Sequence, residues 1–413
     1  MISPAVFYYP SQFPARSTRA ALDAASLLPP HGFLVDGGAN GIQTVLAERL
    51  AMLPRPAPEG ADIFFGFLQA HGPPAQAWTA EDHEAIAAMG PDDVTYIPNS
   101  MRLQVHYMCR QLSNTSFMRN RLPHLSRRTL RRHVILTPFL PGQCDYEARI
   151  TGKSFPPISK WVSHILLTLN TDNLVSRGNI AFREISMPYL SSVRWSVGWS
   201  GSPPWQQPIA LAGEGRSHLV CFTGSLRGQP QSVALRKRLV RGCEAQSARV
   251  CAAHVTEHFP IMAPEDAQGV ERSNMRKALR LKLHSTFCLE PPGYSPPRKS
   301  SIDSMLSGCI PVWFYSDDEF DALWPFHLGG LDGWGANASV RVPLARALDG
   351  SIDVLRLLQD IPQQKVHSMR AVLAENAHRF VYGVGPYPGD AIDTMLNALS
   401  VGLSPSRTAA ATW

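Results

Sequence analysis

The sequence predicts an α/β protein made of two doubly wound domains that face each other across a cleft. In both halves, short apolar runs of strand length alternate with segments whose apolar residues recur at helical spacing, which is typical of parallel sheets covered by helices. In the second half this alternation runs from His218 to Val340. In the first half the predicted strands are Ile63 to Leu68, Val134 to Thr137 and Ile165 to Leu169, and the predicted helices include Ile42 to Leu53 and Ala80 to Met89.

A stretch rich in Gly, Ser and Pro, Gly198 to Pro208, is the predicted domain boundary, because neither a helix nor a central strand can run through it. We therefore expect an amino-terminal α/β domain over residues 1–200 and a carboxy-terminal α/β domain over 209–345. The helices predicted beyond the second sheet, within 346–400, are expected to pack back toward the amino-terminal domain.

Composition is that of a globular protein with a basic surface. The 413 residues are 44% hydrophobic and 17% charged, with a formal net charge of +6, which favours acidic ligands such as nucleotide diphosphates or acidic polysaccharides. The densest basic run, Arg119 to His133, comes without a recognition-helix pattern or zinc-finger spacing, so we predict no nucleic-acid partner. No apolar run approaches the ~20 residues that a transmembrane helix needs.

The seven cysteines contain no CxxC pair, so a zinc site is not expected. Cys243 and Cys251, eight residues apart around a helix end, are a candidate disulfide in an oxidising compartment. Cys221, Cys288 and Cys309 lie in or beside predicted strands, where we expect them to pack in the core.

The most informative segment, His284 to Asp318, is predicted to form a strand, a loop, a short helix and a second strand. The apolar run Ser285 to Glu290 ends at a Pro-Pro-Gly break, and Ile310 to Phe314 resumes as a strand. Between them, Ser300 to Ser307 has apolar residues at helical spacing. Ser300 can cap the start of this helix and Gly308 can end it in the left-handed conformation.

Two cations stand at the start of that helix. Arg298 and Lys299 lie where the helix macrodipole disfavours positive charge by ~0.3 to 1 kcal/mol each. A bound diphosphate would remove this conflict by accepting hydrogen bonds from the free helix amides and from a bidentate Arg298. The alternative is a pair of solvated loop cations. The strand-loop-helix context favours the anion site.

The same segment resembles the exostosin family, glycosyltransferase family 47, and most closely its plant-type xyloglucan galactosyltransferase branch. The family's acidic residue after the loop glycine is Tyr294 here, which removes the basis for expecting a donor contact from that carboxylate. The matching positions are Phe287-Cys288-Leu289, Pro291, Gly293, Ser295, Arg298-Lys299-Ser300, Asp303-Ser304 and Gly308-Cys309-Ile310-Pro311-Val312.

The resemblance continues on both sides of this segment. Upstream, a strand and helix resemble the family's F-x-G-x-x-R strand end and the helix after it, carried here by Phe222, Gly224, Arg227, Arg236 and Cys243. Downstream, Ile361 to Pro386 is similar to the branch's I-P-x-x-x-V-x-x-M-R helix. In the amino-terminal half, Gly60 to Leu68 and Arg183 to Ser192 match more weakly.

The resemblance implies a GT-B arrangement and an inverting glycosyltransferase that uses a nucleotide sugar, such as UDP-galactose, with the carboxy-terminal domain holding the nucleotide sugar and the amino-terminal domain on the acceptor side. Arg298, Lys299 and the helix start would stabilise the leaving diphosphate, and Asp303 could accept hydrogen bonds from ribose hydroxyls. The predicted donor-binding residues are Arg227, Gly293, Ser295, Arg298, Lys299, Ser300 and Asp303.

No metal-ligand set stands out, since Asp317 and Asp318 are better suited to the first turn of a helix, so we expect cationic side chains to replace a metal. Asp36 is the predicted catalytic base, with His31 and His71 as alternatives. A loop Asp that merely caps the next helix is an equally good interpretation of Asp36.

The resemblance further implies a polysaccharide or glycoprotein glycan as acceptor, the Golgi lumen or membrane as location, and homo- or hetero-oligomers with related glycosyltransferases as possible assemblies. A second interpretation is a catalytically silent family member that serves as a partner subunit or binds glycans. Arg298, Ser300 and Asp303 favour the enzyme, whereas Tyr294 and the uncertain base favour the silent member.

Overall fold

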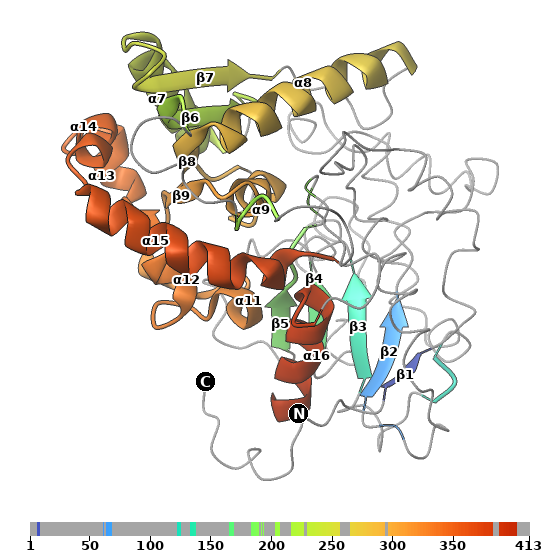
Figure 1. The fold of residues 1–413 in the computed structure, drawn as a ribbon. Helices are drawn as coiled ribbons and strands as arrows, with labels where there is room; N and C mark the ends of the chain where they lie inside the picture. Colours follow the sequence, from blue (N-terminus) through green and yellow to red (C-terminus); the bar gives the residue numbers. More distant parts are fainter. Residues whose placement is uncertain are drawn as a thin grey trace. The chain divides into compact units, whose positions relative to one another are not determined.

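The computed structural model is drawn in Figure 1. It describes residues 6–8, 61, 63–67, 122–124, 133–137, 165–168, 183–189, 191, 193, 203–206, 216–226, 229–256, 265–293, 296–382 and 388–402. By packing, the chain divides into two units, and the described residues from Pro188 to Met395 make up the second.

The first unit contains a parallel five-stranded sheet whose strands pair in chain order. The predicted strands are confirmed to within a residue or two of their bounds, while the predicted helices Ile42 to Leu53 and Ala80 to Met89 lie outside the described residues. The strands are β1 (Val6–Tyr8), β2 (Ile63–Phe67), β3 (His133–Thr137), β4 (Ile165–Thr168) and β5 (Arg183–Ser186).

The second unit is built on another parallel sheet, with the strand order β10-β9-β8-β6-β7. Its strands β8 and β9 are buried along almost their whole length, because helices cover both faces of the sheet. The strands are β6 (His218–Gly224), β7 (Cys251–Val255), β8 (Ser285–Glu290), β9 (Ile310–Trp313) and β10 (Val340–Arg341).

Alternate residues of the central strands point into two different cores. Val220, Phe222 and Phe287 share one core with helices α7 (Pro230–Glu244), α14 (Val354–Gln359) and α15 (Gln363–Asn376). The second core contains Trp313 with helices α8 (Glu265–Leu283) and α9 (Lys299–Leu306). Helices on both faces of a parallel sheet make this unit doubly wound, so the α/β prediction is confirmed.

Shorter helices complete the second unit. Asp317 and Asp318 do begin a helix, as predicted: Ser316 and Glu319 form a capping box that satisfies its first amides. The remaining helices of this unit are α10 (Asp317–Asp321), α11 (Pro325–Leu328), α12 (Trp334–Asn337), α13 (Leu344–Asp349) and η7 (Ala377–Phe380). Helix α16 (Ala391–Gly402) belongs to the second unit up to Met395 and to the first unit from Leu396.

Two expectations about the domain limits need correction. The predicted boundary Gly198 to Pro208 lies inside the second unit, because Trp205 is only 1% exposed and packs in one of its cores. Of the helices predicted to return to the amino-terminal domain, α14 and α15 belong to the second unit, whereas α16 belongs to the first unit from Leu396. Leu358 and Met369 lie in the same core as strand β6, since the apolar faces of α14 and α15 are buried against that sheet.

Two further features bear on the biology. The predicted disulfide between Cys243 and Cys251 is present and joins the end of α7 to β7. Among the described helices, none combines the length and the apolar character that crossing a bilayer requires.

Candidate functional site

The strand order of the second sheet marks where a ligand would bind. From β6 the chain moves outward to β7, then returns past β6 to β8 and continues to β9 and β10. The loops after β6 and β8 therefore diverge at the same edge of the sheet. In open α/β sheets, the crevice beyond the carboxyl ends of two such strands is the usual ligand site.

Arg236 of helix α7 joins these two loops. The residue is 2% exposed, and its guanidinium donates hydrogen bonds to the carbonyl oxygen of Ser225, after β6, and to that of Pro292, after β8, the latter at 3.0 Å. The backbone amide of Gln229 also donates to the carbonyl oxygen of Gly293 at 3.3 Å. The loops are therefore held as one structure.

Arg298 lies against Gly293 at the start of helix α9. A Cβ atom on Gly293 would lie 2.5 Å from Nη1 of Arg298, so the missing side chain leaves room for that guanidinium, while Nη2 of Arg236 would be at an ordinary contact distance of 3.6 Å. Burial lowers the pKa of Arg298 from its usual value, and the hydroxyls of Tyr315 and Tyr189 act in the opposite direction. Within the described residues, neither Arg236 nor Arg298 forms an ion pair.

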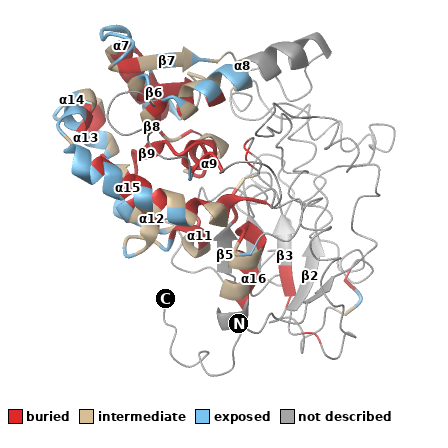
Figure 2. Ribbon diagram, viewed as in Figure 1, coloured by how far each residue is buried: buried red, intermediate tan, exposed pale blue. Residues whose placement is uncertain are grey.

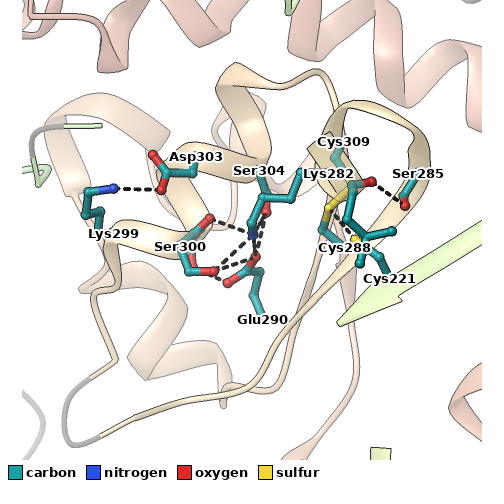
Figure 3. Close-up of polar contacts among 12 residues, drawn as sticks. Cys221, Lys282, Ser285, Cys288, Glu290, Lys299, Ser300, Asp303, Ser304 and Cys309 are labelled. Carbon is teal, nitrogen blue, oxygen red and sulfur yellow. Dashed lines mark hydrogen bonds and ion pairs between the residues drawn. A yellow bond between two sulfur atoms is a disulfide. The ribbon is translucent and has the colours of Figure 1, made fainter. Parts of the chain in front are cut away.

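The next residue, Lys299, is paired differently. Its Nζ atom lies 2.8 Å from Oδ2 of Asp303 (Figure 3). Oδ1 of Asp303 accepts a hydrogen bond from Ser191 at 2.6 Å. Asp303 is 6% exposed, so it is not on a solvent-facing stripe of the helix. Both oxygen atoms of this carboxylate therefore already accept a hydrogen bond, and a ribose hydroxyl would have to share one of them.

Ser300 does not cap the helix. The N-cap position is Arg298, which makes no side-chain capping bond. Instead, Oγ of Ser300 accepts a hydrogen bond from Nζ of Lys282 at 3.0 Å and donates to Glu290 at 3.3 Å. The predicted left-handed stop at Gly308 is confirmed, with φ of 65°.

Sequence reasoning missed Lys282 and Glu290. Their side chains are 3% and 2% exposed and meet at 2.7 Å behind the first turn of α9. The sequence did contain one indication of this pair: Glu290 is a carboxylate at the end of an otherwise apolar strand. A buried charge needs a partner, and the last turn of the preceding helix offered Lys282.

The remaining predicted residues lie outside the described residues. These are the candidate base Asp36, its alternatives His31 and His71, and the predicted donor-binding residues Arg227 and Ser295. The described part of the predicted donor site is therefore Gly293, Arg298, Lys299, Ser300 and Asp303.

Three sulfur atoms meet beneath this site. Cys288 and Cys309 pack in the core, as expected, and they also form a disulfide between β8 and the start of β9, which was not predicted. Cys221 of β6 remains a thiol 3.3 Å from Cys288, and burial raises its pKa to about 11. This is the only grouping of three potential metal ligands in the described chain, and the disulfide occupies two of them.

The chain matches a protein family and several known proteins. The model of the Exostosin GT47 domain matches residues 94–353. This range includes the strands, loops and helix of the candidate site. More than half of the chain is therefore covered by one family, the one that the motifs resemble.

Individual relatives agree. Two probable xyloglucan galactosyltransferases of Arabidopsis thaliana are both 26% identical, over 43% and 54% of this chain and 34% and 44% of their own lengths. The xyloglucan-specific galacturonosyltransferase 1 of the same plant is 33% identical over 30% of this chain and 16% of its own length. This chain thus spans less than half of each of these relatives.

A solved structure of trehalose-6-phosphate synthase aligns with 88% of this chain and 96% of its own at 10% identity, with a TM-score of 0.41, which is too low to bear on the fold. The predicted resemblance to the exostosin family and its xyloglucan galactosyltransferase branch is confirmed by the family match and the plant relatives. The chain belongs to the exostosin GT47 family.

Proposed function

We propose that this chain is a glycosyltransferase that holds a nucleotide sugar by its diphosphate at the loop between β8 and α9. The observation that carries this proposal is the cation Arg298, which has no carboxylate partner among the described residues and lies against Gly293. Lys299 is neutralised by Asp303 and Lys282 by Glu290. Arg298 and Arg236 therefore leave two positive charges beside the loop, which matches the charge of a bound diphosphate.

The chemistry follows from that charge. When the bond between the sugar and the β-phosphate breaks, negative charge develops on the phosphate oxygens, and a fixed guanidinium stabilises it. The amide groups at the start of α9 add further donors. In this proposal cationic side chains do the work that a metal ion would otherwise do, and inversion requires a base in the amino-terminal half, for which Asp36 is the candidate.

The finer assignments rest on the family. The relatives are named as xyloglucan galactosyltransferases and a xyloglucan galacturonosyltransferase, so we propose a UDP-sugar donor, such as UDP-galactose, and a polysaccharide or glycoprotein glycan as acceptor. The same resemblance supports a GT-B arrangement, a Golgi location and oligomers with related transferases.

Titration with UDP tests the proposal. Calorimetry on the full chain is expected to show binding, and Arg298→Ala is expected to weaken it at least tenfold, or about 1.4 kcal/mol, because a buried charge-assisted contact is lost. Arg356→Ala is the matched control, since Arg356 forms an exposed ion pair with Asp360 on α14. No binding of UDP, or equal binding by Arg298→Ala, would contradict the proposed function.

A second measurement separates an enzyme from a silent family member. Incubation with UDP-sugars and GDP-sugars in the absence of acceptor is expected to release free sugar from one of them, and Arg298→Ala should reduce that release. A chain that binds UDP but hydrolyses and transfers no sugar would be a binding or partner subunit.

A further inference from the structure

Behind the first turn of α9 lies a buried polar network that the proposed mechanism does not use. The Nζ atom of Lys282 donates to Oε1 of Glu290 at 2.7 Å, to Oγ of Ser304 at 2.6 Å and to both oxygens of Ser300 at 3.0 and 3.1 Å. Oε2 of Glu290 accepts from Ser301 at 3.3 Å. Figure 3 shows Lys282 of α8, Glu290 of β8, and Ser300 and Ser304 of α9 converging.

Stability alone is a poor reason for this arrangement. Removing two charges from water costs free energy that a buried ion pair regains only with favourable geometry, and apolar residues of similar volume are often as stable or more so. Lys282 and Glu290 are 3% and 2% exposed, so they bear most of that cost. Such a pair is better explained by the conformation that it imposes.

The Lys282–Glu290 pair connects the two segments that meet at Arg298. Glu290 is the last residue of β8 and directly precedes the Pro-Pro-Gly turn that contains Gly293. In α9 the pair binds Ser300, Ser301 and Ser304. The first two lie two and three positions after Arg298, and the amide of Ser301 donates to the carbonyl oxygen of Arg298 at 3.2 Å. One ion pair thus links the glycine side of the site to the helix that carries its cation.

The pair does this without changing the charge of the site. A lone lysine at a helix start would oppose the macrodipole, and a lone glutamate would cancel the charge that attracts an anion. Together the two side chains hydrogen-bond to four oxygen atoms of α9 and contribute no net charge to the site. The charge of Arg298 is left to act on a ligand.

We propose that Lys282 and Glu290 are positioning residues that set the distance between Gly293 and Arg298, so that the guanidinium meets a pyrophosphate. The inference rests on the proposed function. Neither residue contacts the ligand. Their effect should therefore be on the affinity for the diphosphate, beyond any effect on stability.

The test uses the double variant Lys282→Met with Glu290→Leu, which replaces the pair by apolar side chains of similar volume. Each single change leaves a buried charge unpaired and should lower the thermal midpoint strongly, whereas the double variant should recover much of that loss. The double variant is nevertheless expected to bind UDP at least tenfold more weakly than the wild type, as measured by calorimetry.

Two further variants make the outcome decisive. Leu358→Ala, in the other core of the unit, should lower the thermal midpoint but keep the wild-type affinity for UDP. Ser301→Ala removes only the hydrogen bond from Ser301 to Oε2 of Glu290, should fold normally, and should weaken UDP binding about threefold. It keeps the test decisive if the double variant does not fold.

Wild-type affinity in Ser301→Ala, or in a folded double variant, would overturn the inference while leaving the proposed function intact. A wild-type chain that fails to bind UDP would overturn both. Weak binding in the double variant and in Ser301→Ala, with the wild-type affinity retained in Leu358→Ala, supports the positioning role.

Discussion

Gly293 shows how one missing side chain creates a binding position. Its backbone φ is not in the left-handed region, so conformational freedom does not explain the glycine. The reason is space, because a Cβ atom would lie 2.5 Å from Nη1 and 3.2 Å from Cζ of Arg298. The guanidinium occupies the volume that any other residue would fill.

Gly293→Ala should therefore separate affinity from stability. The added methyl group displaces the flexible end of Arg298, so the thermal midpoint should change little, while UDP affinity should fall roughly tenfold, or about 1.4 kcal/mol. Calorimetry and thermal unfolding of the same preparation check this. Gly242→Ala on α7 is the control, since its Cβ would meet only Leu355 at an ordinary 3.7 Å. Unchanged UDP affinity in Gly293→Ala would show that Arg298 need not lie there.

His327 makes stability depend on pH. Burial lowers its pKa from 6.5 to about 4, and its Nε2 bonds to the carbonyl oxygen of Ala391 at 3.0 Å. Between these two pH values the unfolded chain binds a proton that the folded chain does not, so stability should fall as pH decreases from about 6.5 to 4, by roughly 3 kcal/mol in total from this residue.

The check is urea unfolding at pH 7 and pH 5 for the wild type and for His327→Gln, which cannot take up the proton. The variant should lose less stability than the wild type on acidification. An equal loss of stability in both proteins would mean that another group causes the pH dependence. His254 and His378 are examples, because burial also lowers their pKa values.

Helix α9 shows what periodicity can and cannot predict. Its bounds and its left-handed end were predictable, and the end forms a Schellman motif, with the amide of Cys309 bonded to the carbonyl of Ser304 and that of Gly308 to Met305. Its surroundings were not predictable. Spacing indicated one apolar face, whereas the helix is buried from Ser301 to Leu306 (Figure 2), because its polar face meets Lys282 and Glu290.

The disulfides make a prediction about elements. Cys288–Cys309 closes a loop that contains the whole of α9, and chain-entropy arguments give it a stabilisation of roughly 3 kcal/mol. Mass spectrometry of a non-reduced digest should find this pair and Cys243–Cys251.

Cys221, buried and with a pKa raised to about 11, should react with iodoacetamide only after unfolding. Alkylation of Cys221 in the native protein, or a Cys221–Cys288 pair in the digest, would contradict this arrangement of sulfur atoms.

The topology of the second sheet makes a prediction about the whole molecule. The loops after β6 and β8 lie together only because the strand order reverses between these two strands. Hydrogen exchange on the full chain with and without UDP should therefore show protection in two separate sequence regions, around 225–230 and 290–302.

The strands of the first sheet provide the internal reference. Binding of UDP by the site proposed here should leave the amides of β2 to β5 unchanged. Protection confined to those strands would place the nucleotide in the other unit.

By itself, the sequence determined the α/β class, the strands and helices around the site, the cations at the start of α9 and the family. These follow from local spacing and from motifs of adjacent residues. Only the tertiary structure decided which cations have a carboxylate partner: Lys299 and Lys282 have one, whereas Arg298 has none among the described residues. It also decided the Cys288–Cys309 pair and the unit to which α14 and α15 belong. The physical reason is that ion pairs, disulfides and burial depend on which distant segments the fold brings together. The spacing of residues along the chain does not determine these contacts.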